Sequence, residues 1–166
     1  YAFFLAENSN LKDFGVSGQL LYLGITERGL KQREFMEHLK SGRTGKSSFR
    51  RSIGAILKED LNLKAIPRTA KADKKYSANY KFDEYGEKRL TDWIKSNCTF
   101  GYYDFSFHEP NHEYDRDFLE TIEDNLTINY CPTLNLSKGT RKYNMYADAL
   151  DDLRKVCRRE VERSYS

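Results

Sequence analysis

Two short apolar and aromatic runs open the chain, and the polar turn formers between them predict a β-hairpin. The runs are YAFFLAE at residues 1–7 and GQLLYLGIT at residues 18–26. The segment NSNLKDFGVS between them is rich in asparagine, aspartate, glycine and serine, which favour turns. A helix should follow over about residues 30–40, where the dipeptide SG ends it.

A second helix is predicted to begin at Ser47 or Ser48, because a serine hydroxyl can accept a hydrogen bond from the first helical turn. Helical spacing places Arg50 and Arg51 on its polar face. The apolar face carries Phe49, Ile53, Ile56 and Leu57. The polar run at residues 68–79 lacks periodicity, so we expect it to be an exposed connector.

The second half of the chain predicts three more helices and one strand. Residues 83–97 have helical spacing, with Leu90, Trp93 and Ile94 facing inward. Residues 99–109 alternate as a strand. The final two helices are expected at residues 113–129 and 144–163. Strands and helices that mix without strict β-α-β alternation indicate an α+β domain, with a small three-stranded antiparallel sheet flanked by helices.

Length and composition indicate a single domain in a cytoplasmic protein. A chain of 166 residues with 39% hydrophobic residues can fold as a single domain over residues 1–166. Its three cysteines form no C-x-x-C pair, which argues against a disulfide framework or a zinc site and favours reduced thiols. No apolar run approaches the roughly 20 residues of a membrane span, and the first residues lack a secretion-signal layout. We therefore expect a cytoplasmic protein without a membrane partner.

Positive charge gathers in one part of the chain. Residues 27–58 hold nine Lys or Arg against three Asp or Glu. Such a segment suits a polyanion, because neutralising phosphates releases condensed counterions. A solvated helix face is the alternative.

The loop SGRTGKSSFRR at residues 41–51 is the best candidate for gripping a nucleic acid. Its glycines allow close backbone approach, and the start of a helix offers free N–H groups to a phosphate. It lacks the glycine spacing of a P-loop, which excludes that class of nucleotide-binding protein. The candidate nucleic-acid contacts are Arg43, Lys46, Ser47, Ser48, Arg50 and Arg51.

A later predicted helix carries a glutamate at the border of its apolar stripe. At about 100° per residue, Glu123 falls at the edge of the stripe and Glu120 nearly opposite its centre. The stripe consists of Phe118, Leu119, Ile122 and Leu126. Glu123 can therefore face a cleft while its helix stays anchored. The alternative is a salt-bridge partner at the helix boundary. Against it stand Asn135, twelve residues after the glutamate, and Pro132 between them.

Five features follow one another in this chain. They are a hairpin, a YLG triplet, an arginine-containing helix, a basic glycine loop and a segment that runs from a glutamate to P-x-x-N. This order resembles the GIY-YIG nuclease family. YLG at residues 22–24 resembles its second tyrosine motif, and residues 123–135 resemble its glutamate-to-asparagine segment. The resemblance covers residues 1–136 and leaves the C-terminal helix outside it. It assigns catalytic positions to Tyr1, Tyr22, Arg33, His38, Glu123 and Asn135.

The chain departs from the family pattern at two points. The opening GIY motif is not intact, so Tyr1 is our choice for its tyrosine, with Phe3 the alternative in another register. Arg33 and His38 are five residues apart where the family often shows four. Five residues place them about 140° apart on a regular helix, and a one-residue bulge would align them. His38 is thus either an active-site group or a surface residue.

The resemblance implies a metal-dependent endonuclease that hydrolyses phosphodiester bonds of DNA, most readily double-stranded. Tyrosine hydroxyls at Tyr1 and Tyr22 would orient or deprotonate the water, and Arg33 would bind the phosphate. Glu123 would hold one Mg²⁺ or Mn²⁺, and Asn135 would bond near the metal or order its turn. Two alternatives stay open: a nucleic-acid-binding module on the same scaffold that does not cleave, and a basic scaffold protein without a nucleic-acid role.

Overall fold

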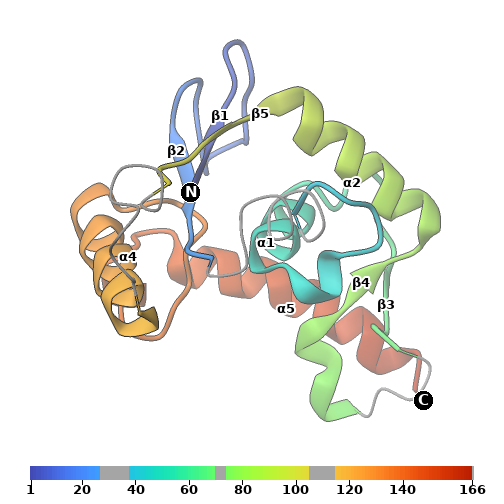
Figure 1. The fold of residues 1–166 in the computed structure, drawn as a ribbon. Coiled ribbons are helices and arrows are strands. Elements are labelled where there is room, and N and C mark those ends of the chain that lie inside the picture. The colour runs from blue at the N-terminus through green and yellow to red at the C-terminus, as the bar shows by residue number, and fades with distance from the viewer. Residues whose placement is uncertain (27–37, 70–73, 105–114, 166) are drawn as a thin grey trace.

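A three-stranded antiparallel sheet forms one half of the molecule. In the computed structural model, β1 (Ala2–Leu5) lies between β2 (Leu20–Leu23) and β5 (Cys98–Gly101). Phe3 pairs with Tyr22 on one side and with Phe100 on the other. The predicted hairpin and the antiparallel sheet of three strands are confirmed (Figure 1). The structure describes residues 1–26, 38–69, 74–104 and 115–165.

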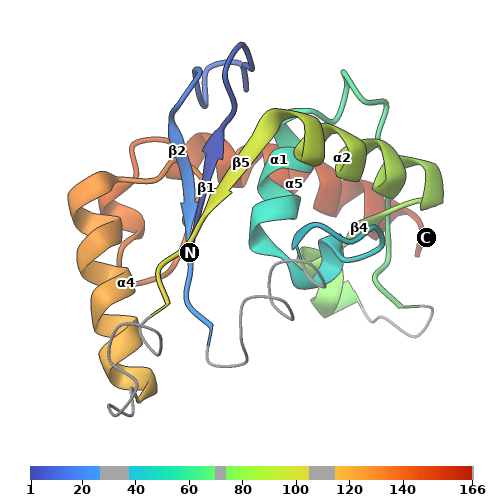
Figure 2. The same cartoon turned by 45° about the horizontal axis from the view of Figure 1, so that its top comes forward.

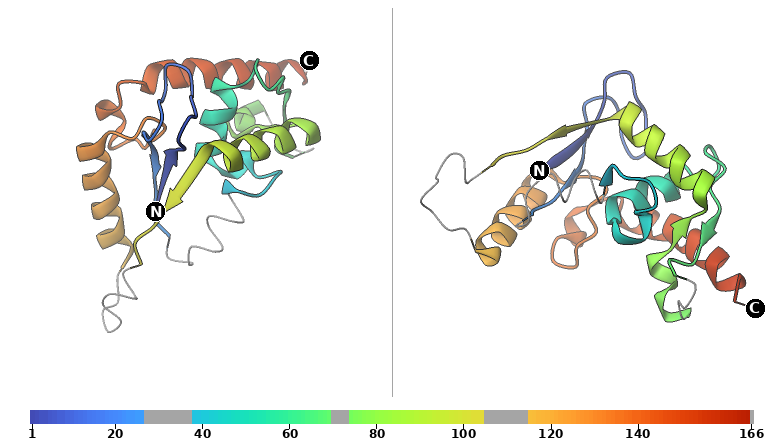
Figure 3. Two further views of the ribbon diagram at one scale, coloured as in Figure 1. Left: turned by 90° about the horizontal axis from the view of Figure 1, so that it is seen from above. Right: turned by 45° about the vertical axis from the view of Figure 1, so that its right-hand side comes forward.

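Four α-helices of the described chain surround this sheet. They are α1 (Ser48–Ile56), α2 (Glu84–Asn97), α4 (Arg116–Tyr130) and α5 (Ala147–Arg163). Helix α4 packs beside β2, whereas α2 leads directly into β5 on the other side of the sheet (Figure 2). Helix α5 runs along α1 and closes the molecule from one side (Figure 3). The α+β fold class is thereby confirmed.

The helices begin where short polar side chains cap them. The Ser47 hydroxyl accepts a hydrogen bond from the Arg50 N–H at 3.1 Å, and Asp83 and Asp115 cap α2 and α4 in the same way. Helix α4 ends at Cys131, which adopts a left-handed conformation with φ 45°. Each of the three N-terminal caps satisfies a backbone N–H that the helix itself leaves unpaired, which typically contributes about 1 kcal/mol.

The segment after α1 is more structured than a connector. A second sheet pairs β3 (Ala65–Ile66) with β4 (Lys81–Phe82), and a 3-10 helix spans Lys74–Asn79. Ser77 and Tyr80 are both 1% exposed. The prediction of an exposed connector at residues 68–79 is therefore wrong for its last part. Strands of two residues are too short to produce a detectable alternation of polar and apolar positions.

The core lies between the sheet and α1. The rings of Phe3 and Phe49 stack with their centroids 4.3 Å apart, and Ile53 of α1 is also fully buried. Leu90 and Ile94 of α2 join this core as predicted. Full burial of each such side chain contributes about 1.5–3 kcal/mol. This packing fixes the end of the sheet at which β1 begins and β2 ends.

The later strand is shorter than predicted. It ends at Gly101 instead of continuing to residue 109, and the rest of that expected strand lies partly outside the described residues. None of the helices in the described ranges is long and apolar enough to cross a membrane.

Candidate active site

Tyr1 lies at the end of the sheet, directly against Gly24 of the YLG triplet. The Tyr1 main-chain nitrogen donates to the Gly24 carbonyl at 2.9 Å, and the Gly24 N–H donates back to the Tyr1 carbonyl at 3.0 Å. The tyrosine ring covers the glycine so closely that a Cβ atom at Gly24 would lie 2.5 Å from the Tyr1 Cζ. The triplet therefore needs its glycine to leave room for the tyrosine.

Tyr22 joins Tyr1 in an aromatic cluster at this end of the sheet. The ring centroids of the two tyrosines are 6.3 Å apart, and that of Tyr22 is 5.5 Å from Phe49. Phe100 of β5 lies 6.2 Å from Tyr1. Two of the tyrosine positions predicted from the sequence thus meet, although they stand 21 residues apart in the chain.

His38 belongs to the same cluster and is buried. Its side chain is 1% exposed, and its ring centroid lies 5.8 Å from that of Tyr22. Its Nε2 is 3.0 Å from the Tyr1 hydroxyl, and its Nδ1 is 2.8 Å from the Ser47 hydroxyl. The alternative of a surface histidine is therefore wrong. Arg33 lies outside the described residues, so the expected alignment of Arg33 and His38 on one helix also falls outside them.

Arg50 is the main correction to the predicted nucleic-acid contacts. Its guanidinium is 0% exposed and forms an ion pair with Glu87 at 2.9 Å. It also donates to the Thr44 hydroxyl, the His38 carbonyl and the Thr91 hydroxyl at 3.1, 2.9 and 2.8 Å. Burial lowers the pKa of Arg50, and the charge of Glu87 partly offsets this effect. The prediction that Arg50 lies on the polar face is wrong, because its donors are used inside the protein.

The other predicted phosphate contacts divide by exposure. Ser47 is 1% exposed, and its hydroxyl bonds His38 and the start of α1, so it does not face a ligand at the surface. Arg51 is half-buried and donates to the carbonyls of Thr44 and Gly45 at 3.2 and 3.1 Å. Burial lowers the pKa of Arg51 to about 10, with the nearby Arg154 adding to the shift. Arg43, Lys46 and Ser48 keep solvent access and, among the residues that the structure describes, form no such inward side-chain bonds.

Glu123 is closer to the middle of the inner face of α4 than the sequence predicted. Leu119 and Glu123 are half-buried, and Thr127 is 4% exposed, at intervals of four residues. Phe118 and Leu126, expected in the inner stripe, are 41% and 38% exposed. Glu123 therefore lies on the more buried face of α4, a helix that packs beside β2, the strand that carries Tyr22.

Asn135 orders the backbone next to the site. Its side-chain oxygen accepts from the Leu23 N–H at 2.9 Å, and its amide donates to the Leu23 carbonyl at 3.0 Å. The Leu134 N–H also donates to the Leu21 carbonyl at 2.8 Å, so the segment runs along β2. Asn135 is 5% exposed. The sequence left two roles open for Asn135, bonding near a metal or ordering its turn. These contacts favour the second role.

The donor chemistry around α4 fits a hard cation better than zinc. Within the part of the chain that the structure describes, no three His, Cys, Asp or Glu side chains gather as a ligand set. Structural zinc sites need four protein ligands, whereas Mg²⁺ takes one or two carboxylates and completes its shell with water and phosphate oxygens. A single carboxylate at Glu123 matches the second pattern.

Sequence reasoning missed several groups that build the cluster. The hydrogen bond between Ser47 and His38 and the packing of Phe49 and Phe100 join residues far apart in the chain. From the sequence, Ser47 was predicted as a helix cap and a nucleic-acid contact, but not as a partner of His38. The requirement for Gly24 was partly visible in the YLG triplet, since a glycine after a strand often marks close backbone approach.

The family model described as the GIY-YIG catalytic domain matches residues 5–156 of the chain. The chain therefore belongs to the GIY-YIG family. The match extends into α5, and Tyr1 precedes it. No curated protein and no solved structure matches the chain.

Proposed function

We propose that this protein is a metal-dependent endonuclease that hydrolyses phosphodiester bonds of double-stranded DNA. The observation that carries the proposal is the hydrogen bond between the Tyr1 hydroxyl and His38 Nε2, formed within a cluster that includes Tyr22. Membership in a nuclease family supports the reaction class. The concentration of basic residues in the chain supports a polyanionic substrate.

Tyr1 and His38 supply a route for the proton of the attacking water. In the tautomer with hydrogen on Nδ1, His38 donates to the Ser47 hydroxyl and accepts the Tyr1 O–H at Nε2. The Tyr1 oxygen can then pass its proton to His38 while it takes one from water. Ser47 holds the ring because its own oxygen is fixed by the Arg50 N–H. Tyr22 lies beside this pair and would orient the water.

Positive charge must meet the phosphate as negative charge develops in the transition state. Arg33 would provide a planar, permanently charged donor to two phosphate oxygens. Glu123 would hold Mg²⁺ or Mn²⁺, which when bound stabilises the charge on the phosphate and the leaving oxygen. The half-buried position of Glu123 on the inner face of α4 supports this assignment.

Plasmid nicking tests the proposal. With Mg²⁺ or Mn²⁺ the protein should convert supercoiled DNA to nicked circles, and EDTA should stop the reaction. Glu123→Gln should lower the rate by at least 100-fold, because the metal would lose its protein ligand. Glu120→Gln is the matched control, since Glu120 is exposed on the same helix and pairs only with Arg116 in the described structure.

The two alternatives give different results in the same assay. Intact DNA with every metal, together with tight DNA binding, would replace the proposal with a module that binds without cleaving. Absence of binding at low salt would remove the nucleic-acid function altogether. Cleavage of an RNA duplex but not of DNA would contradict the proposed substrate.

A further inference from the structure

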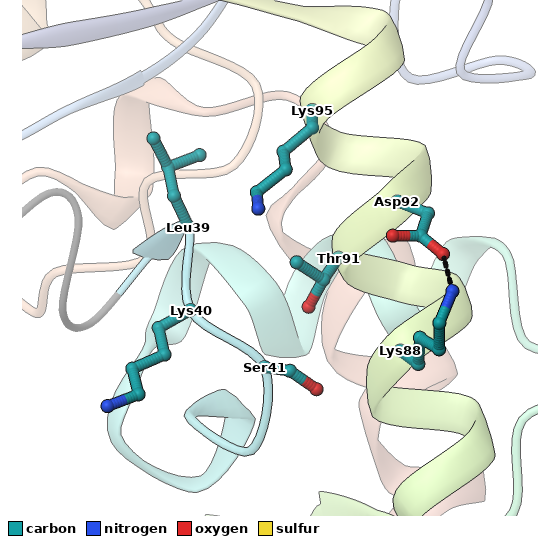
Figure 4. A pocket seen from close by; sticks show the side chains of 7 residues that line it. All are labelled: Leu39, Lys40, Ser41, Lys88, Thr91, Asp92 and Lys95. Carbon is teal, nitrogen blue, oxygen red and sulfur yellow. Dashed lines mark hydrogen bonds and ion pairs between the residues drawn. The ribbon is translucent and has the colours of Figure 1, made fainter.

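A pocket beside the candidate active site has not yet been given a function. It has a volume of about 620 Å³ and lies between α2 and the loop that follows His38 (Figure 4). Leu39, Lys40 and Ser41 form the loop wall. Lys88 and Lys95 rise from the helix wall. The volume is within the range of small-ligand sites, about 300–1,000 Å³.

The pocket carries excess positive charge. Lys88 is neutralised by Asp92, whose carboxylate lies 2.6 Å from its ammonium. Among the described residues, Lys40 and Lys95 form no ion pair, so two positive charges remain uncompensated at the pocket. Figure 4 shows the Lys95 side chain entering the space between α2 and Leu39, while Lys40 extends from the outer side of the loop.

Buried hydrogen bonds fix the pocket in position relative to the active site. The Arg50 guanidinium donates to the His38 carbonyl at 2.9 Å and to Thr91 of the pocket wall at 2.8 Å. The Gly42 N–H donates to the Glu87 carboxylate at 3.0 Å, and Gly42 has φ +79°, which favours glycine. The loop wall, the helix wall and the catalytic histidine are therefore connected through one buried arginine and its carboxylate.

We propose that this pocket binds a backbone phosphate of the nucleic acid next to the one that is cleaved. This inference rests on the proposed function. The Lys95 ammonium would meet the phosphate inside the pocket, Lys40 and the Ser41 hydroxyl would meet it at the rim, and Leu39 would contact the sugar. Lysine suits this task because its compact charge pairs with phosphate without a fixed fork geometry. The contact would position the strand and carry no sequence information.

Binding measured as a function of salt tests the pocket separately from catalysis. The double variant Lys40→Ala, Lys95→Ala would be compared with wild type on a 20-base-pair duplex in EDTA, where the proposed reaction does not run. The slope of log K against log salt concentration should fall in magnitude by about 1, because one neutralised phosphate contributes roughly 0.9. Lys40→Arg, Lys95→Arg should keep the wild-type slope.

A charge-matched control separates the pocket from a general loss of positive charge. Lys64→Ala, Lys142→Ala removes two exposed lysines that do not line the pocket, and it should leave the slope unchanged. Thermal unfolding should confirm that both double variants fold. An equal loss of slope in the control would contradict the proposal that the pocket binds a phosphate. So would an unchanged slope in the pocket variant, provided that the wild-type protein binds and cleaves DNA. If wild type itself binds no nucleic acid, the proposed function fails first.

Discussion

The two sides of the candidate site are built differently. On the side of β1 and α1, His38, Ser47 and Arg50 are at most 1% exposed and joined by hydrogen bonds. On the side of α4, Glu123 is only half-buried, and its helix exposes large apolar side chains. The groups proposed to move a proton are thus held by the core, while the proposed metal ligand stands on a helix with lighter packing.

From this difference we expect substitutions on one side to affect stability and substitutions on the other to affect activity alone. A proton passes between two side chains only at hydrogen-bond distance, so Tyr1 and His38 need rigid support. A carboxylate that shares its cation with water and phosphate tolerates more freedom. Substitutions near Arg50 should therefore lower the free energy of unfolding, whereas Glu123→Gln should slow cleavage with little change in that free energy.

The largest effect is expected for Arg50→Met. It leaves the carboxylate of Glu87 buried without its partner, and removing one member of a buried ion pair typically costs about 3–5 kcal/mol. Urea unfolding should show this loss. The double variant Arg50→Met, Glu87→Gln should recover part of it, since the uncompensated charge is gone. Equal stability of Arg50→Met and wild type would show that the buried network does not support this side of the site.

Gly24→Ala should lower stability less than Arg50→Met, but it should break the contact between Tyr1 and His38. The new methyl group would collide with the Tyr1 ring and push it away from His38, at a cost of about 1–3 kcal/mol. Nicking should fall together with stability. Gly18→Ala is the control at the same hairpin: its φ of +78° strains the backbone, but no atom lies within 4 Å of the new Cβ. That variant should keep its activity.

Cysteine labelling of the wild-type protein compares the packing around its three thiols. Cys131, at the end of α4, is exposed, whereas Cys157 is 0% exposed. Burial also raises the pKa of Cys98 to about 12, so its reactive thiolate is scarce at neutral pH. A disulfide reagent at neutral pH should label one thiol rapidly, and Cys131→Ser should remove that phase. Rapid labelling of all three thiols would contradict the difference in packing.

Local signals in the sequence predicted much of the fold. Asp83 and Ser47 mark helix starts through their own hydrogen bonds, and the turn-rich segment between β1 and β2 marks the hairpin. Such features involve neighbouring residues, so a single sequence reveals them. Tyr1 and Tyr22 could be placed together for the same reason, because a hairpin brings its two strands side by side.

The errors arose where the decisive partner is distant in the chain. A helical wheel assigns an arginine to the polar face, but Arg50 turns inward toward Glu87, 37 residues later. The same limit applies to His38, whose ring bonds the hydroxyl of Tyr1, 37 residues earlier. On α4 the wheel counted Phe118 as core, although that side chain is 41% exposed.

The central claim is that the Tyr1 hydroxyl and His38 act as one unit in activating water. The most direct measurement is the single-turnover nicking rate of wild type, Tyr1→Phe, His38→Gln and the double variant with Mg²⁺. If the two groups form one proton route, each single variant and the double variant lose nearly the same factor, because residues that act as a unit are strongly non-additive. Losses that multiply in the double variant, or a Tyr1→Phe variant as fast as wild type, would contradict the claim.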